Sequence, residues 1–157
     1  FKWTKDYFSS QINEGKSLLG FKKGMTALDI GAGLGKAMLS LENSGFDTFG
    51  LEPSIPFHEK AISKMKINPE KLKLGSIEEL DYQNNSFDFI TFGAVFEHLY
   101  APSECLEKAM KWLKPNGIIH IEVPSSNWLM PKFMNYYFFC GRSIDCFALF
   151  DRNSEGS

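Results

Sequence analysis

Glycines and carboxylates in the first third of the chain stand in an order that suits the binding of a nucleoside. Gly31, Gly33 and Gly35 alternate with other residues, and this run follows a short apolar stretch. Glycine lets a backbone turn sharply and approach a ligand where a Cβ atom would clash. Asp29 lies two positions before the first glycine, and Glu52 ends the next apolar run. A carboxylate at the position of Glu52 can accept two hydrogen bonds from the 2′,3′-diol of a ribose.

The spacing of the glycines separates two classes of ligand. A dinucleotide fingerprint reads G-x-G-x-x-G, and Lys36 stands where its third glycine belongs. Asp29 adds a carboxylate that would repel a pyrophosphate and attract an ammonium group. This stretch therefore argues against an NAD-linked oxidoreductase and favours a nucleoside that carries an amino acid.

Apolar runs typical of strands alternate with helical spacing up to residue 124. We expect strands at 26–30, 46–51, 71–74, 87–92 and 118–123, helices at 3–19, 34–44, 54–65 and 104–113, and one helical turn at 76–80. Such alternation implies right-handed crossovers and a three-layer α/β fold with a doubly wound, mostly parallel sheet. Ligands of such sheets bind beyond the carboxyl ends of the strands, where the glycine turn and Glu52 both fall.

A series of segments in this order resembles the motifs of class I S-adenosylmethionine-dependent methyltransferases of the small-molecule type, such as methyltransferase types 11, 12 and 23. The segments are 28–35 (LDIGAGLG), 52–54 (EPS), 75–80 (GSIEEL), 87–90 (FDFI), 96–99 (FEHL) and 113–117 (LKPNG). The resemblance covers about residues 20–128. It implies a Rossmann-like methyltransferase fold, S-adenosylmethionine as cofactor and S-adenosylhomocysteine as product.

The resemblance also implies a set of cofactor-binding residues. These are Asp29, Gly31, Ala32, Gly33, Glu52, Pro53, Ser76, Ile77, Phe92 and Glu97. The aspartate and the glycines would hold the methionine end, Glu52 the ribose, and Ser76 with Ile77 the adenine. Many relatives carry aspartate at the position of Ser76, so a weaker or re-routed adenine contact is expected here.

His98 is the candidate catalytic residue. Methyl transfer from a sulfonium is an in-line displacement, so the protein mainly aligns the acceptor and excludes water. An oxygen or nitrogen acceptor also requires a base, and an imidazole with a pKa of about 6.5 suits that role. In the alternative interpretation, Glu97 and His98 only order their loop and the methionine end. His58 is expected on an exposed helix face and His120 in the core.

We expect a single domain over residues 1–157. Residues 1–20 would form N-terminal cover helices, 21–124 the cofactor-binding core, and 125–157 an aromatic-rich substrate cover or a truncated tail. The aromatic residues of the two outer segments that could close the site or stack on an acceptor are Trp3, Tyr7, Phe8, Trp128, Tyr136 and Tyr137. The antiparallel hairpin that usually completes the family's sheet is not evident, because 141–150 is too short for both strands. A missing hairpin would leave an open edge that favours a homodimer.

Composition limits the classes of partner. The net charge is −2 and basic residues form no long run, which argues against a nucleic-acid partner. No apolar run reaches the roughly 18 residues of a membrane span, and no signal peptide is visible. The three cysteines, Cys105, Cys140 and Cys146, lack metal-ligand spacing, so no metal site is expected and free thiols in the cytoplasm are favoured.

The leading interpretation is methyl transfer to a small-molecule acceptor, such as a sugar, a quinone or a phenol. A domain that binds the cofactor without methyl transfer, within a larger assembly, is the alternative.

Overall fold

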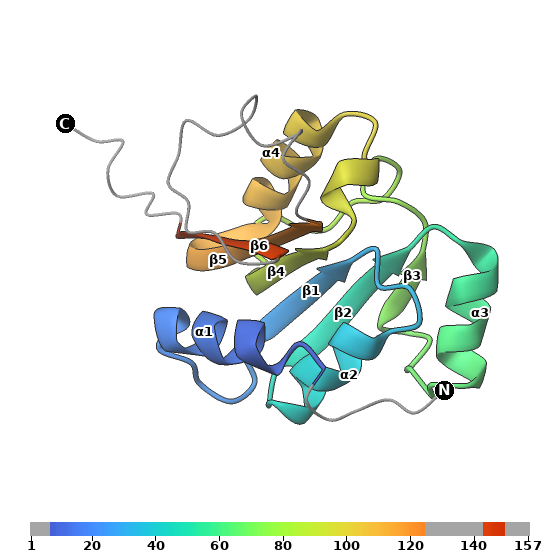
Figure 1. Ribbon diagram of the computed structural model, residues 1–157, viewed down its shortest axis with the longest axis horizontal. Helices are drawn as coiled ribbons and strands as arrows, with labels where there is room; N and C mark the ends of the chain where they lie inside the picture. Colours follow the sequence, from blue (N-terminus) through green and yellow to red (C-terminus); the bar gives the residue numbers. More distant parts are fainter. Residues whose placement is uncertain (1–6, 125–142, 150–157) are drawn as a thin grey trace.

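The computed structural model describes residues 7–124 and the backbone of a strand at 143–149. A single sheet with helices on both faces forms the fold (Figure 1). The elements are α1 (Ser9–Leu19), β1 (Thr26–Ile30), α2 (Lys36–Asn43), β2 (Asp47–Glu52), α3 (Ile55–Ser63), β3 (Leu72–Leu74), β4 (Phe87–Gly93), the 3₁₀ helix η1 (Phe96–His98), α4 (Pro102–Trp112), β5 (Leu113–Pro124) and β6 (Ser143–Leu149).

The strand order is β3-β2-β1-β4-β5-β6. The first five strands are parallel, and β6 runs antiparallel beside β5. Chain order reverses between β1 and β4, which is the position where open α/β sheets bind ligands. The expected three-layer, doubly wound, mostly parallel sheet is confirmed.

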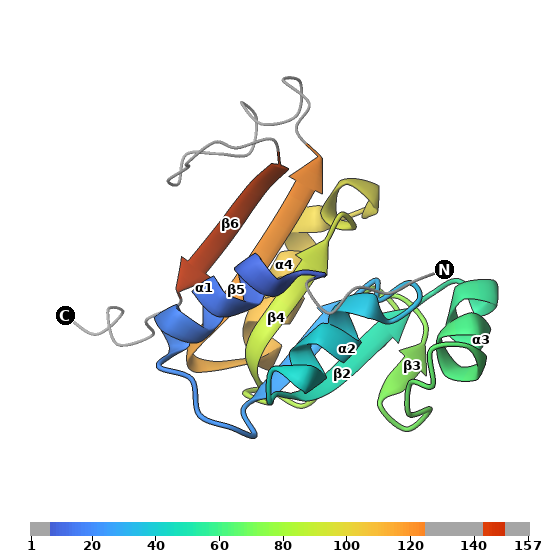
Figure 2. The same ribbon diagram turned by 60° about the horizontal axis from the view of Figure 1, so that its bottom comes forward.

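The central strands are buried on both faces, and their sequences are correspondingly apolar. On one face, Ala27, Phe89 and Ile118 pack with Ile12 of α1. On the other face, a larger cluster packs against Trp112 of α4. Figure 2 shows α1 and α2 in front of the sheet, with α4 behind it.

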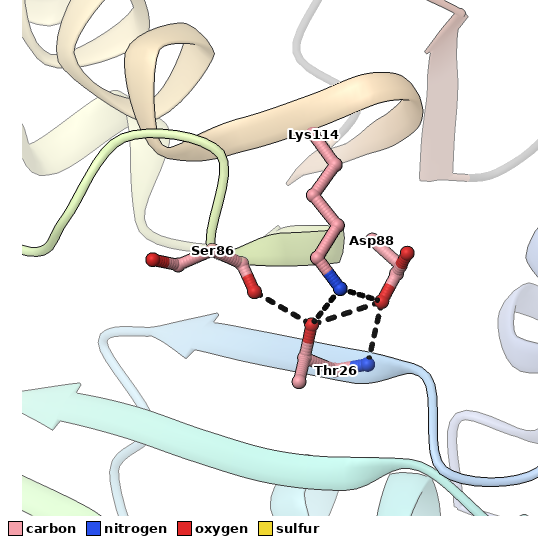
Figure 3. A network of polar contacts seen from close by, with 4 residues as sticks. All are labelled: Thr26, Ser86, Asp88 and Lys114. Atoms are coloured by element: carbon pink, nitrogen blue, oxygen red, sulfur yellow. Dashed lines mark hydrogen bonds and ion pairs between the residues drawn. The ribbon is translucent and has the colours of Figure 1, made fainter.

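A polar cluster joins the amino ends of β1, β4 and β5 (Figure 3). Asp88 Oδ2 accepts hydrogen bonds from Lys114 Nζ at 2.7 Å and from the Thr26 N–H at 2.8 Å. The Thr26 hydroxyl lies 2.7 Å from the carbonyl oxygen of Ser86. Burial acts to raise the pKa of Asp88, but the hydrogen bonds from Lys114 and Thr26 lower it below its usual value. Because this cluster lies at the end of the sheet opposite the expected ligand site, its role is to hold three strands in register.

The predicted strands and helices agree with the structure to within a few residues, except in β5 and at the start of α1. The helix expected over 3–19 begins at Ser9, after a turn at Tyr7 and Phe8, and residues 3–6 lie outside the described part of the chain. Phe87 pairs with Leu113 and Phe89 with Ile118, so the β5 backbone between these pairs bulges out of register. Asn116 in this bulge has φ 63°. The turn expected at 115–117 is thus an irregularity inside β5. The helical turn at 76–80 is confirmed, because the Leu80 N–H donates to the Ser76 carbonyl at 3.0 Å.

The sheet also contains one antiparallel strand that was not evident in the sequence, within the segment judged too short for both strands of the family's hairpin. Residues 143–149 form β6, whose backbone pairs with the outer edge of β5. The sequence of this short segment shows no clear alternation of apolar and polar residues, so its pairing with β5 was not evident. Trp3, Trp128, Tyr136 and Tyr137 lie outside the described residues.

Candidate functional site

The carboxylate of Glu52 is held at the carboxyl end of β2 by two backbone groups. Its Oε2 accepts the Gly33 N–H at 2.6 Å, and its Oε1 accepts the Ser54 N–H at 2.7 Å. The residue is only 5% exposed. An ionised carboxylate offers about four lone-pair positions, so each oxygen retains one for a further donor. Glu52 is therefore preoriented to accept two more hydrogen bonds from a diol.

Asp29 lies near the end of β1 and is 3% exposed. Burial and, secondly, the charge of Glu52 raise the pKa of Asp29 to about 7. A cation bound near this carboxyl would favour its ionised form. The site therefore combines the oriented carboxylate of Glu52 with a second, buried carboxyl group whose ionised form a positively charged ligand would favour.

The three glycines of the turn have different surroundings. A Cβ atom on Gly33 would meet no atom of the described residues within 4 Å, although its φ of 56° is left-handed. A Cβ atom on Gly35 would lie 2.7 Å from Ile67 Cγ1, and one on Gly31 would clash with Val95. Only Gly33 therefore opens the backbone to a ligand, while the other two glycines let the turn pack against the protein.

A small, largely apolar cleft lies beside the turn at the carboxyl ends of β1 and β2. It is lined by Ile30, Gly31, Leu51, Pro53, Gly75, Ser76, Ile77, Glu78, Val95 and Leu99. The Gly75 N–H donates to the Glu52 carbonyl at 3.0 Å, which ties the loop after β3 to the end of β2. The cleft thus brings together four residues predicted to bind the cofactor: Gly31, Pro53, Ser76 and Ile77.

Phe92 of β4 and Glu97 and His98 of η1, which were predicted as site residues, do not line this cleft. Phe92 is fully buried and packs edge-on against Phe96 at 5.5 Å, so its side chain presents no open surface. The side chain of His98 is 78% exposed, and its Nε2 lies 3.8 Å from Glu97 Oε1. Glu97 Oε2 is buried and has no hydrogen-bond partner among the residues that the structure describes. The roles predicted for these three residues remain predictions.

Comparison with known proteins gives a family match at the same residues. A family model described as a methyltransferase domain matches residues 28–121, which is more than half of the chain. The chain belongs to this family. The match extends from β1 into β5 and includes the glycine turn, Glu52 and the cleft.

Two curated relatives and one solved structure illustrate the similarity of this methyltransferase domain to known proteins. A ubiquinone biosynthesis O-methyltransferase from Bradyrhizobium diazoefficiens is 29% identical, with 67% of this chain and 42% of the relative covered. A demethylmenaquinone methyltransferase from Staphylococcus aureus is 30% identical, with coverages of 76% and 51%. The phosphoethanolamine N-methyltransferase 2 of Haemonchus contortus, solved with S-adenosyl-L-methionine, shares the fold at a TM-score of 0.62 and 22% identity, with coverages of 73% and 28%. The chain spans about half the length of these two curated relatives.

The methyltransferase domain has site residues that its sequence motifs did not indicate. Val95 directly precedes the FEHL segment and Leu99 is its last residue. Neither was predicted as a site residue, but Val95 packs on Gly31 and both residues line the cleft. Glu122, near the end of β5, lies close enough to Tyr7 to raise its pKa, after the larger effects of burial and of Asp29. Lys36 directly follows the glycine turn, and its Nζ lies 5.6 Å from the Tyr7 ring centroid, so Tyr7 lies near this turn. Its role in closing the site remains a prediction.

The remaining expectations concern histidines, metals and membranes. His120 is completely buried, as predicted, whereas His58 is half-buried and its Nε2 lies 3.0 Å from the Leu72 carbonyl. Within the described part of the chain, no three His, Cys, Asp or Glu side chains gather into a metal site. Among the same residues, no helix combines the length and apolar content needed to cross a membrane.

Proposed function

We propose that this methyltransferase domain binds S-adenosylmethionine and transfers its methyl group to a small-molecule acceptor by direct displacement. The observation that carries the proposal is the carboxylate of Glu52, oriented by Gly33 and Ser54 with lone pairs left for a diol. The structural relative from Haemonchus contortus, solved with S-adenosyl-L-methionine, supports the same cofactor.

The described residues fit the parts of this cofactor. Glu52 would accept the two ribose hydroxyls, and the open backbone at Gly33 would lie along the methionine end. Asp29, buried beside Glu52, provides the negative charge that suits an ammonium or sulfonium group. The apolar cleft walls at Pro53 and Ile77 would border the adenine.

When bound, S-adenosylmethionine supplies a methyl group that is already activated by a positively charged sulfur. The protein residues then have to align the acceptor, exclude water and, for an oxygen or nitrogen acceptor, remove a proton. His98 is the candidate base, since its imidazole lies on the surface after β4 and next to Glu97.

The acceptor class that we propose is a quinol or a related phenol. This assignment rests on the curated relatives, which are named for ubiquinone biosynthesis and for demethylmenaquinone methylation. The hydroxyl of a phenol loses its proton more easily than that of a sugar. A histidine base is therefore sufficient for such an acceptor.

Calorimetry with S-adenosylmethionine tests the cofactor, comparing wild type with Glu52→Ala and with the control Glu42→Ala in α2. We expect binding by wild type and by the control, and a large loss of affinity in Glu52→Ala. A wild type that shows no binding at high micromolar cofactor rejects the proposal. Formation of S-adenosylhomocysteine with a panel of quinols, phenols and sugars then tests the acceptor. Cofactor binding without turnover of any acceptor would favour the alternative of a binding domain.

A further inference from the structure

A row of polar side chains crosses the sheet on the face that α1 covers. Asp29 of β1 pairs with Thr91 of β4, and Thr91 pairs with His120 of β5. Thr91 and His120 are 0% exposed and Asp29 is 3% exposed. Polar groups are rarely buried this completely without a specific arrangement of partners. The row leads from the cofactor site to a buried imidazole.

The imidazole of His120 is fixed from several sides. Thr91 Oγ1 lies 2.9 Å from its Nδ1, a hydrogen-bond distance. Phe89 stacks on the ring at 6.4 Å, and Phe8 meets it edge-on at 5.1 Å with an interplanar angle of 69°. His120 therefore provides a rigid surface against which the residue that precedes α1 is packed.

Phe8 adopts a backbone conformation that phenylalanine rarely takes. Its φ of 63° and ψ of 14° are left-handed, and it directly precedes the first residue of α1. Such conformations persist only where the surroundings enforce them, and they cluster at functional sites. The contact with His120 is one enforcing interaction, and stacking with Tyr7 at 6.4 Å is a second.

The turn at Phe8 places Tyr7 near Lys36, the residue that follows the glycine turn. The carboxyl groups of Asp29 and Glu122 act on its phenol, and Lys36 Nζ lies 5.6 Å from the ring centroid. Tyr7 remains 45% exposed, so its ring is available to a ligand. We propose that His120 is a positioning residue for the cofactor: through Phe8 it holds Tyr7 over the methionine end of the site. This inference rests on the proposed function.

A double-mutant cycle on the full chain tests the inference, with the dissociation constant of S-adenosylmethionine as readout. His120→Leu and Tyr7→Ala should each weaken binding about tenfold, the size of a lost aromatic contact. Because His120 acts through Tyr7, the double variant should bind no more weakly than Tyr7→Ala alone. Effects that multiply would overturn the inference, since independent sites behave additively in free energy.

A rescue variant separates positioning from simple loss of packing. His120→Leu leaves the Thr91 hydroxyl without its partner, whereas the combination of Thr91→Val with His120→Phe removes both polar groups and retains a ring against Phe8. We expect this combination to bind the cofactor within about twofold of wild type. If the combined variant bound the cofactor as weakly as His120→Leu, a ring at position 120 would not be what positions Tyr7.

Ile118→Ala is the matched control, because Ile118 is fully buried on the same face of β5. It should lower Tm and leave cofactor affinity unchanged. An equal loss of affinity in Ile118→Ala and His120→Leu would show that core packing alone matters, and would overturn the inference. A wild type that binds no cofactor rejects the proposed function and this inference together. A binding wild type whose affinity is insensitive to His120 rejects the inference alone.

Discussion

Glu52 Oε2 accepts the backbone N–H of Gly33 at 2.6 Å, so the end of β2 holds the turn that follows β1. The same carboxylate also accepts the Ser54 N–H, which begins the connection to α3. One side chain therefore holds the glycine turn and, in the proposed function, also accepts the ribose diol of the cofactor. Loss of this carboxylate is expected to affect both stability and cofactor binding.

Glu52→Gln tests this double role in the cofactor-free protein. A glutamine side chain has one amide oxygen, so it can accept only one of the two N–H groups well. The other backbone N–H would face the amide NH₂ group, which is also a donor. We expect this unpaired contact to lower the free energy of unfolding by about 1–3 kcal/mol. Chemical denaturation measures the change. Glu42→Gln in α2 is the control and should change stability by less than about 0.5 kcal/mol. Equal stability of Glu52→Gln and wild type would contradict this account.

Asp29→Asn should change how stability depends on pH. Asp29 has a pKa of about 7 in the folded chain, against 3.8 ordinarily. Between these values the folded chain holds a proton that the unfolded chain has lost, so this group makes stability fall as pH rises through the window. The asparagine variant should lose that decline and be at least as stable as wild type at pH 8. Thermal unfolding of both proteins across this pH range measures the effect. Parallel curves of Tm against pH for wild type and Asp29→Asn would contradict the prediction.

The same ionisation predicts a pH dependence of cofactor binding. Because a cationic ligand favours the carboxylate form of Asp29, the affinity of wild type for S-adenosylmethionine should rise as pH increases through 7. Asp29→Asn should bind more weakly and without this rise. Calorimetry at a series of pH values distinguishes the two. An equal rise of affinity with pH in Asp29→Asn would show that another titrating group causes the pH dependence.

Alanine at Gly33 and at Gly35 should have different effects. Both glycines have left-handed φ values, 56° and 78°, so each substitution is expected to cost about 1–2 kcal/mol of stability. Gly35→Ala should cost more, because its Cβ atom would also lie 2.7 Å from Ile67 Cγ1. Gly33→Ala should weaken cofactor binding more strongly, since its methyl group would project into open space at the turn. Denaturation and calorimetry on both variants measure these effects, and the reverse order of effects would contradict the assignment.

Asp88→Asn should destabilise the amino end of the sheet without a direct effect on the site. Asp88 accepts bonds from Lys114 and Thr26, so its loss is expected to cost about 1–3 kcal/mol at neutral pH. The lowered pKa of Asp88 means that wild type loses this contribution as pH falls through that pKa, so the difference between the proteins should vanish in acid. Asp81→Asn is the control, because Asp81 is 77% exposed in its 3.2 Å pair with Lys108. Equal Tm values for Asp88→Asn and Asp81→Asn at neutral pH would argue against this role.

Much of the site was predictable because its signals are local. Apolar runs indicate the strands, and a ligand of a parallel sheet meets the residues at their carboxyl ends. The positions of Asp29, Gly33 and Glu52 in the chain were therefore sufficient to place them together. The resemblance of these segments to methyltransferase motifs was confirmed by the family match.

Contacts between distant residues were not predictable in the same way. The sequence showed three similar glycines. In the structure Gly31 packs against Val95 and Gly35 against Ile67, whereas the backbone at Gly33 is open. His98 was predicted from its position after β4; its side chain is 78% exposed and its catalytic role remains a prediction. β6 pairs with β5 across a separation that no local periodicity reveals.

By itself, the sequence determined the fold class, the order of its elements and the residues at the ends of β1 and β2. Those properties follow from apolar periodicity and from residue types along a short stretch of chain. Only the tertiary structure decided that Glu52 accepts a hydrogen bond from the Gly33 N–H. It alone also decided that the His120 ring packs against Phe8, which in turn stacks with Tyr7. Hydrogen bonds and ring contacts depend on strand register and burial, and these arise only when segments far apart in the chain pack together.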